Sequence, residues 1–494
     1  MIQALISIVS VGIVVWFNLL PLKYLVLIGL ILIWLLTLVY YFFYSGVRKK
    51  KGKKLTAQKK KRKLYIKRSI GGVISAITMA LCIVASSMVW QAGNALANIA
   101  DNVVVTDTVS VYALADNPAE SVADIKDGVF AITQNYDYEH TKTTLDKIRE
   151  NLGQDVHTQN YDTVFDMVDA LYAGNVDAMI LNVAYVDVIR DQKGYEDFSD
   201  RTKTLYDHEV KTSVVQENTQ DTRDITKDPF IIYISGSDTR NLNLATSRSD
   251  VNILAVVNPA SKQVLLLNTP RDYYVETTVS GGMRDKLTHC GIYGIDCSMG
   301  TLTNLYEENV DYYVQINFNG FETLIDAIGG ITVEAEKSFR TSEGGYYISQ
   351  GTNQLSGAVA LSYVRERKSF ADGDNARGRH QMQAIEAIIK KVSSGTTVLN
   401  NYSAILSSME GMFATNMSSS EISALVRMQL TDMASWNVKS FAVTGTGSSQ
   451  KTYSMPTKRS YVMIPDESQI DYARKLVDKV VDGGILSDND LIMP

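Results

Sequence analysis

The chain has 494 residues, of which 45% are hydrophobic, and it carries a formal net charge of −6. Residues 1–92 hold 14 Lys and Arg and no Asp or Glu, which leaves 34 basic and 54 acidic residues for the rest of the chain. Broad binding of nucleic acid depends on neutralising phosphates with a basic face, so the acidic remainder argues against nucleic acid as a partner.

Three apolar stretches open the chain: Ala4–Leu20, Leu22–Tyr44 and Ile70–Trp90. The second would span roughly 34 Å as a helix, which is enough to cross a lipid bilayer. The basic sequence RKKKGKKLTAQKKKRK follows it, and the positive-inside rule places this loop, residues 45–68, in the cytoplasm. We therefore expect a multi-pass membrane protein with three transmembrane helices in residues 1–92, a cytoplasmic N-terminus and extracellular C-terminal domains.

A smaller α/β unit is predicted for residues 108–221, after a linker at 93–107. VSVYALA and NVDAMILNVA have the pattern of strands, and HTKTTLDKIRENL and TVFDMVDALYAG have helical apolar spacing. Strands alternating with helices indicate a layered α/β unit. It contains no nucleotide-binding loop, metal cluster or nucleophile elbow, so we interpret it as an accessory spacer or partner-docking domain.

The main domain is predicted for residues 229–494, with its core at 229–392. PFIIYISG, DVNILAVVN, QVLLLN and DYYVQIN are apolar runs typical of buried strands. FETLIDAIGG, SGAVALSYVRER and NARGRHQMQAIEAIIKKV have helical periodicity. The fold class is thus mixed α/β, a central and mostly buried β-sheet flanked by helices.

Charged residues stand where the first two of these strands end and begin. Asp238 and Arg240 follow the first strand, and Arg248 and Asp250 come just before or at the start of the second. If the strands are neighbours, both loops open at one end of the sheet. Two carboxylates beside arginines suit a hard divalent cation shared with a phosphate. The alternative is that the carboxylates only pair with the arginines or cap turns.

Arg271 and Asp272 directly follow the third strand, and Pro270 restricts the backbone there. Four more arginines occur in YVRERKSFADGDNARGRHQ, within an acidic part of the chain: Arg365, Arg367, Arg377 and Arg379. The planar fork of arginine matches phosphate oxygens two at a time. The pattern therefore predicts a local site for a multiply charged anion.

The spacing of these residues sets conditions on that site. Arg365 and Arg367 would diverge by roughly 200° on a helix, so they reach one pocket only if their segment is extended or frayed. Arg377 and Gln381 share a helix face, and Asp374 is the expected N-cap of that helix. His380 is expected to be a solvated helix residue.

Other features exclude competing chemistries. The chain has no G-x-x-x-x-G-K-[ST], G-x-S-x-G or H-E-x-x-H motif, so nucleotide-loop, serine-hydrolase and zinc-hydrolase functions lack their parts. Cys290 and Cys297 lie where a disulfide is permitted, but we expect two free thiols.

Six motifs in order resemble the LytR–CpsA–Psr family, particularly its streptococcal capsule-type members: SGSDTR, SRSDVNIL, NTPRD, GMRDKLTH, YVRER and D-x-x-R-x-x-x-Q (Asp374, Arg377, Gln381). The resemblance covers Pro229–Val392 closely. It implies an enzyme that takes an anionic glycopolymer, here a capsular polysaccharide, from a polyprenyl-pyrophosphate carrier and attaches it to peptidoglycan. Two departures from the family pattern are His380, where a second arginine is frequent, and KLTHCGIYG, which matches only at Lys286.

Site residues follow from the same resemblance. Asp238 and Asp250 would hold Mg²⁺ (or Mn²⁺), and the prenyl chain would lie in an apolar tunnel within the core. Arg271, Arg365, Arg367 and Arg377 would be catalytic. The resemblance identifies no general base: Asp272 is one candidate for a catalytic role as the base, and metal-bound solvent is the alternative. Contacts to the pyrophosphate would come from Arg248, Arg271, Lys286, Arg365, Arg367, Arg377 and Gln381.

Two other functions would use the same residues. One is a polyprenyl-pyrophosphate phosphatase with water as acceptor, and the other is a non-catalytic membrane regulator of capsule assembly that binds other assembly proteins. The sequence does not distinguish the polymer, the acceptor sugar or the oligomeric state.

Overall fold

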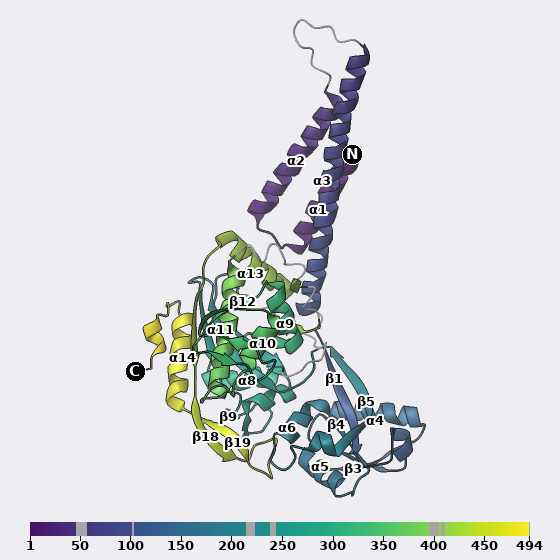
Figure 1. Ribbon diagram of the computed structural model, residues 1–494, viewed down its shortest axis with the longest axis vertical. Helices are drawn as coiled ribbons and strands as arrows, with labels where there is room; N and C mark the ends of the chain where they lie inside the picture. The colour runs from purple at the N-terminus through teal and green to yellow at the C-terminus, as the bar shows by residue number, and fades with distance from the viewer. Residues whose placement is uncertain are drawn as a thin grey trace.

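The computed structural model describes residues 1–45, 57–100, 103–213, 223–237, 244–394, 405–406 and 411–493. Three helices at the N-terminus, α1 (Ile2–Phe17), α2 (Leu22–Tyr44) and α3 (Ala57–Ala100), stand together on one side of the globular part (Figure 1). Helices α2 and α3 are long and apolar enough to cross a membrane. Helix α1 has 16 residues, roughly 24 Å, and is shorter than a bilayer core. Two candidate spans are therefore present among the described residues, and the third span stays a prediction.

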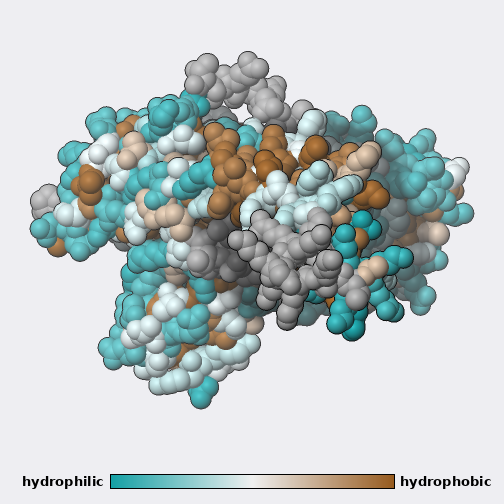
Figure 2. Space-filling view, turned by 90° about the horizontal axis from the view of Figure 1, so that it is seen from above, coloured by the Kyte–Doolittle hydropathy of each residue, from teal (hydrophilic) through white to brown (hydrophobic). Residues whose placement is uncertain are grey.

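The surface of these helices differs from that of the rest of the molecule. No residue of α2 is buried, although its side chains are apolar. Most of the exposed large hydrophobic residues lie between residues 1 and 90. Seen from above, hydrophobic side chains gather in one region among mainly hydrophilic surroundings (Figure 2). Apolar side chains exposed in such a group are typical of a segment in contact with lipid.

Residues 104–213 form a five-stranded sheet with the strand order β3-β2-β4-β1-β5. Alternate side chains of its strands point to opposite faces. Val109 and Val111 pack with α4 on one face, and Tyr112 packs with α5 on the other. The elements are β1 (Val104–Leu114), β2 (Val129–Ile132), α4 (Tyr138–Leu152), β3 (His157–Asn160), α5 (Val164–Tyr172), β4 (Ala178–Asn182), α6 (Val186–Arg190), α7 (Phe198–Arg201) and β5 (Thr202–Ser213).

The second sheet has six strands in the order β16-β11-β6-β7-β8-β17. The central pairs β6–β7 and β7–β8 are antiparallel, whereas β11–β6 and β8–β17 are parallel. Its strands are β6 (Phe230–Ser237), β7 (Ser249–Asn258), β8 (Gln263–Asn268), β11 (Tyr312–Asn317), β16 (Phe413–Thr415) and β17 (Asn437–Ala442).

Helices cover both faces of this sheet, which explains the continuous apolar runs of its central strands. Leu254 and Val256 of β7 face α8 (Ile295–Tyr306) and α14 (Glu467–Val481). Ile253 and Ala255 face α11 (Asp374–Ser393). Figure 1 shows α14 and α11 on opposite sides of the sheet. The mixed α/β prediction for this region is confirmed.

The remaining elements surround these layers. Helices α9 (Phe318–Ala327) and α10 (Gly357–Arg365) pack beside α11, and α13 (Ser419–Asp432) lies toward the N-terminal helices (Figure 1). The short elements are β9 (Tyr274–Glu276), β10 (Arg284–Lys286), β12 (Ile331–Ala335), β13 (Phe339–Arg340), β14 (Tyr347–Ile348), β15 (Gly351–Leu355), β18 (Gly445–Gln450), β19 (Ser460–Pro465) and the 3₁₀ helices Val122–Ile125, Val183–Tyr185, Leu287–Tyr293 and Asp488–Leu491.

The two sheets belong to units that contact each other directly. The backbone N–H of Thr246 donates to Asp107 (2.6 Å), and the N–H of Thr106 donates to the carbonyl of Leu244 (2.9 Å). Tyr136 and Tyr453 meet edge to face with 6.0 Å between ring centroids. Helix α6 of the first unit lies on the side that faces the second unit (Figure 1).

Candidate active site

The central strands of the second sheet bring distant charged residues to one edge. Strands β6 and β7 are antiparallel neighbours, with Ser237 opposite Ser249, so the end of β6 lies beside the start of β7. Strand β8 also runs antiparallel to β7, with Asn268 opposite Ile253. The segment after β8 therefore emerges at the same edge, and this places Arg271 against Asp250. The condition that these two strands be neighbours is met. Asp238 and Arg240 lie outside the described residues.

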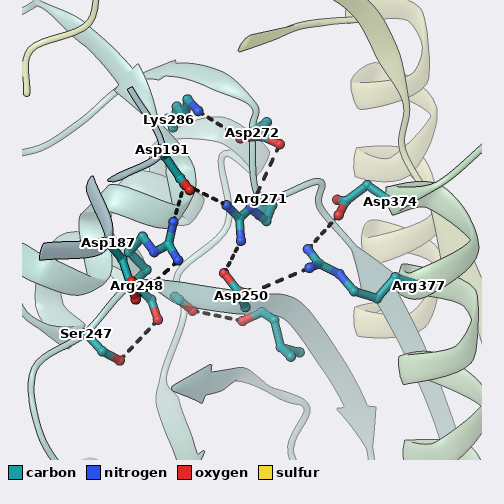
Figure 3. Close-up of polar contacts among 12 residues, drawn as sticks. Asp187, Asp191, Ser247, Arg248, Asp250, Arg271, Asp272, Lys286, Asp374 and Arg377 are labelled. Carbon is teal, nitrogen blue, oxygen red and sulfur yellow. Dashed lines mark hydrogen bonds and ion pairs between the residues drawn. The ribbon is translucent and has the colours of Figure 1, made fainter. Parts of the chain in front are cut away.

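Arg271 contacts three carboxylates at this edge. One guanidinium nitrogen lies 2.5 Å from Asp250 Oδ1, the second lies 3.5 Å from Asp191 Oδ2, and Nε lies 3.9 Å from Asp272 (Figure 3). Its side chain is only 10% exposed. A buried arginine requires such anionic partners because burial without them is costly.

Arg377 approaches the same carboxylate from helix α11. Its Nη2 lies 2.6 Å from Asp374 and its Nη1 lies 3.6 Å from Asp250 (Figure 3). The predicted N-cap role of Asp374 is wrong. The cap is Gly373, whose φ of 47° suits a glycine, and Asp374 is the first residue of the helix. That position directs the Asp374 carboxylate toward the arginine one turn later.

Arg365 and Arg367 meet the condition that their spacing imposed. Helix α10 ends at Arg365, and Glu366 has an extended backbone with ψ 128°. The two arginines consequently do not diverge as they would on a continuous helix. Arg365 pairs with Glu343 and lies over the ring of Phe318, 4.2 Å from its centroid.

Lys286 completes the cationic set from strand β10. Its Nζ lies 3.3 Å from Asp272 Oδ1 (Figure 3). The neighbouring Asp285 is fully buried and accepts hydrogen bonds from the Lys286 N–H (2.7 Å) and the Ser454 N–H (2.9 Å), while His289 Nδ1 lies 2.8 Å away. This network holds the end of strand β10, from which Lys286 projects.

Charge on these groups depends on their mutual contacts. Burial opposes ionisation of Asp250, but the guanidinium groups of Arg271, Arg377 and Arg248 outweigh it and hold its pKa below the ordinary value. Burial raises the pKa of Asp374, against the opposing effect of Arg377. At neutral pH Asp250 is therefore a carboxylate held between arginines.

The arginines and Lys286, together with Asp250 and Asp272, line one cavity of about 780 Å³. Asp374 and Asp285 are not among its lining residues. Its mouth is cationic, and its depth is apolar, between β6, β7 and β11 on one side and α9, α11 and α13 on the other. The predicted residues that line it are Arg248, Asp250, Arg271, Asp272, Lys286, Arg365, Arg367, Arg377 and Gln381. An apolar depth below a charged mouth suits a ligand with an anionic head and a hydrocarbon tail.

Some predicted residues lie elsewhere. The Arg379 side chain is 40% exposed, outside the cavity, and pairs with Asp372 and Glu336. The expectation for His380 is wrong, because its ring is buried and stacks on Tyr363 with 4.2 Å between centroids. Cys290 and Cys297 are free thiols, as expected.

Three acidic residues at the site were missed from the sequence. Asp191 follows helix α6 and lines the cavity, where it pairs with Arg248 and Arg271. Asp187 Oδ2 lies 3.4 Å from Arg248 Nη2, and Glu343 pairs with Arg365. The carboxylates of Asp187 and Asp191 come from the first sheet's unit, far from the arginines in sequence. No sequence motif surrounds these acidic residues. The only signal that could have indicated them is that their negative charge is complementary to that of the arginines.

Among the described residues, no group of three or more His, Cys, Asp and Glu is arranged to hold a metal ion. Magnesium needs fewer protein ligands, since one or two carboxylates suffice when phosphate oxygens and water fill the other positions. Asp250 lines the cavity mouth and has a lowered pKa, so its donor chemistry fits a divalent cation shared with a phosphate.

Comparison with known proteins shows the family to which the chain belongs. The model of the LytR_cpsA_psr family matches residues 189–470, more than half of its length. The chain belongs to the LytR_cpsA_psr family. The resemblance seen in the six motifs is thus confirmed at the level of the family.

The chain is similar to named members of the family over part of its length. It is 37% identical over 174 residues to the polyisoprenyl-teichoic acid–peptidoglycan teichoic acid transferase TagU of Halalkalibacterium halodurans, which covers 35% of this chain and 56% of the relative. It is 37% identical over 194 residues to TagU of Enterococcus faecalis, covering 39% and 63%. The matches thus span less than two thirds of these relatives. The crystal structure of Bacillus subtilis TagV aligns with a TM-score of 0.44 and 27% identity, over 52% of this chain and 98% of that one.

Proposed function

We propose that the protein is a membrane-anchored extracytoplasmic phosphotransferase that moves an anionic glycopolymer from a polyprenyl-pyrophosphate carrier to peptidoglycan. The observation that carries the proposal is a cavity with a cationic mouth and an apolar depth. The pyrophosphate would lie at the mouth and the prenyl chain in the depth. Relatives named as teichoic acid–peptidoglycan transferases support transfer of a polymer to the wall.

The position of the cavity relative to the membrane helices supports a lipid carrier. Helix α13 supplies Leu425, Met428 and Leu430 to the apolar lining. The same helix is hydrogen-bonded to the turn between α1 and α2. Lys23 donates to the carbonyl of Thr431 at 2.9 Å, and Arg427 donates to the carbonyl of Asn18. The apolar end of the cavity is thus adjacent to the segment that we expect in the bilayer.

The arginines would act mainly by electrostatic stabilisation. An acceptor hydroxyl on peptidoglycan forms a bond to the phosphorus that bears the polymer, and the bridging P–O–P bond breaks to release polyprenyl phosphate. Negative charge grows on the bridging oxygen, and pre-positioned donors such as Arg271 and Arg377 stabilise it. A bound divalent cation, held by Asp250 with Asp238, would neutralise additional phosphate charge.

A base must accept the proton of the acceptor hydroxyl. Asp272 lines the cavity mouth, its carboxylate 3.3 Å from Lys286 Nζ and 3.9 Å from Arg271 Nε. Contacts with these two cations hold the Asp272 carboxylate at the mouth, where an acceptor hydroxyl would approach it. We assign Asp272 this role in the proposal.

The polymer is the least constrained part of the proposal. The motifs resemble capsule-type members, which suggests capsular polysaccharide, whereas the relatives named above act on teichoic acid. In the proposal the cavity binds the prenyl chain and the pyrophosphate and not the polymer itself, so the same cavity would serve either.

The test uses the full chain in lipid nanodiscs with magnesium, peptidoglycan fragments and lipid-linked saccharides of both types. Polymer appearing on the wall fragment supports the transferase and identifies the preferred polymer. Release of soluble saccharide phosphate without wall attachment indicates the phosphatase, with water as acceptor. Binding of lipid without either product indicates the regulator.

A further inference from the structure

Arg248 and Arg271 are held by a carboxylate from the other unit of the molecule. Asp191 Oδ2 contacts a guanidinium nitrogen of each arginine, closely for Arg248 and at 3.5 Å for Arg271 (Figure 3). Guanidinium groups bind carboxylate and phosphate oxygens through the same N–H donors. Asp191 therefore stands where part of a diphosphate would bind.

The carboxylates at the mouth differ in how firmly they are enclosed. The side chains of Asp250 and Asp272 are 16% and 17% exposed, whereas that of Asp191 is 39% exposed. Displacing Asp191 returns a partly exposed carboxylate to water, and the incoming anion keeps the two buried arginines paired, so neither arginine is left without an anionic partner. Asp191 is consequently the easier of these groups for an incoming anion to displace.

The position of Asp191 in the chain separates it from the rest of the cavity. It follows helix α6 in the unit formed by residues 104–213, whereas Arg248 and Arg271 belong to the second sheet's unit. Direct contacts join the two units, including the hydrogen bond from Thr246 to Asp107. The smaller unit thus has a position from which it acts on the anion site.

We propose that Asp191 is a displaceable internal anion that holds Arg248 and Arg271 until a diphosphate takes its place. The proposal rests on the function proposed above, and it gives the smaller α/β unit a role in setting the affinity of the cavity mouth. Asp191 keeps two buried arginines paired and oriented without substrate. It also lowers the affinity for the diphosphate, because the ligand must compete with it.

The decisive variant is Asp191→Asn in the full chain, titrated calorimetrically with inorganic pyrophosphate and magnesium. We expect about 3- to 10-fold tighter binding, because one competing charge is removed while the arginines remain. Asp191→Glu, which keeps the charge, should bind as the native chain does. Asp155→Asn removes the same charge from a side chain of the same unit that is 95% exposed and outside the cavity, and should leave the affinity unchanged.

A merely structural role for Asp191 gives the opposite sign. If Asp191 only orients the arginines, then Asp191→Asn binds pyrophosphate more weakly, and this outcome overturns the proposal, as does unchanged binding. In a transfer assay, Asp191→Asn should lower KM without raising kcat if Asp191 competes with the diphosphate. It should raise KM if Asp191 only orients the arginines.

A second variant keeps the test decisive should Asp191→Asn fail to fold. Asp187→Asn removes the weaker, 3.4 Å partner of Arg248 and leaves Asp191 in place. We expect a smaller gain in affinity in the same direction, and a loss overturns the proposal. If neither the native chain nor the variants bind pyrophosphate, the anion site itself is wrong; binding by the native chain without a gain in either variant refutes only the role of Asp191.

Discussion

Arg271 and Arg377 come from different elements and share one carboxylate. Asp250 Oδ1 lies 2.5 Å from Arg271 Nη1, and its Oδ2 lies 3.6 Å from Arg377 Nη1. One arginine follows strand β8 and the other belongs to helix α11, so Asp250 joins the sheet edge to the helix layer. This arrangement keeps two guanidinium groups facing the same cavity mouth.

Loss of either arginine should abolish transfer. We expect Arg271→Ala and Arg377→Ala each to lower the transfer rate at least about 100-fold, because each removes a donor aimed at developing charge. Arg379→Ala is the matched control on the same helix, since its side chain points outside the cavity and is 40% exposed. Transfer rates and melting temperatures of the three variants test this; full activity in Arg377→Ala would refute the site.

The use of magnesium in the transfer reaction should depend on Asp250. Removing divalent cations with EDTA should stop transfer, and Asp250→Asn should raise the magnesium concentration for half-maximal activity at least about tenfold. Asp372→Asn is the control, because Asp372 is 41% exposed and pairs with Arg379 outside the cavity. Activity that is indifferent to EDTA would rule out the metal.

Burial of His380 should make stability fall in acid. Burial lowers the pKa of His380 to about 4, from an ordinary value of 6.5. The unfolded chain then binds a proton between pH 6.5 and 4 that the folded chain does not, so stability is present above pH 6.5 and is lost as the pH falls toward 4. The difference between the two pKa values of His380 corresponds to a loss of about 3 kcal/mol in the free energy of unfolding.

The measurement is the melting temperature between pH 7 and pH 4.5. His380→Phe places a neutral ring between Tyr363 and Phe370 and should show a smaller loss than the native chain. His157→Gln, at an exposed position of β3, should behave as the native chain does. An identical acid response in native chain and His380→Phe would contradict the prediction.

Filling the apolar depth should separate lipid binding from anion binding. Ile388 lines the cavity from α11, and Ile388→Trp should weaken binding of a polyprenyl-phosphate probe about tenfold or more, because the extra volume occupies the space for the chain. Affinity for inorganic pyrophosphate should not change. Lys390→Trp on the same helix, at a side chain 64% exposed, is the control. Equal lipid binding by both variants would place the prenyl chain elsewhere.

All three cysteines should react as free thiols in the denatured chain. Cys82, Cys290 and Cys297 are buried and unpaired with one another as disulfides. Denaturing the chain without a reductant should release three equivalents of reactive thiol, the same number as after reduction. One equivalent before reduction would mean that Cys290 and Cys297 are joined.

The sequence by itself determined the strands of the second sheet and which residues stand at their ends. Buried strands are continuous apolar runs, and this pattern is local, so β6, β7 and β8 were predicted with Arg271 directly after the third. Antiparallel neighbours then put the end of one strand beside the start of the next. Two of the three expected membrane segments were equally readable, because length and hydrophobicity are properties of composition, and the third stays a prediction.

Tertiary structure decided which charges face one another. Asp191 precedes Arg248 by more than fifty residues and reaches it only because the smaller unit docks on the edge of the second sheet. The end of α10 at Arg365 and the burial of His380 among aromatic rings also depend on packing between elements. A sequence pattern records the face a residue takes on its own helix or strand, whereas ion pairs and burial depend on distances that only the folded chain defines.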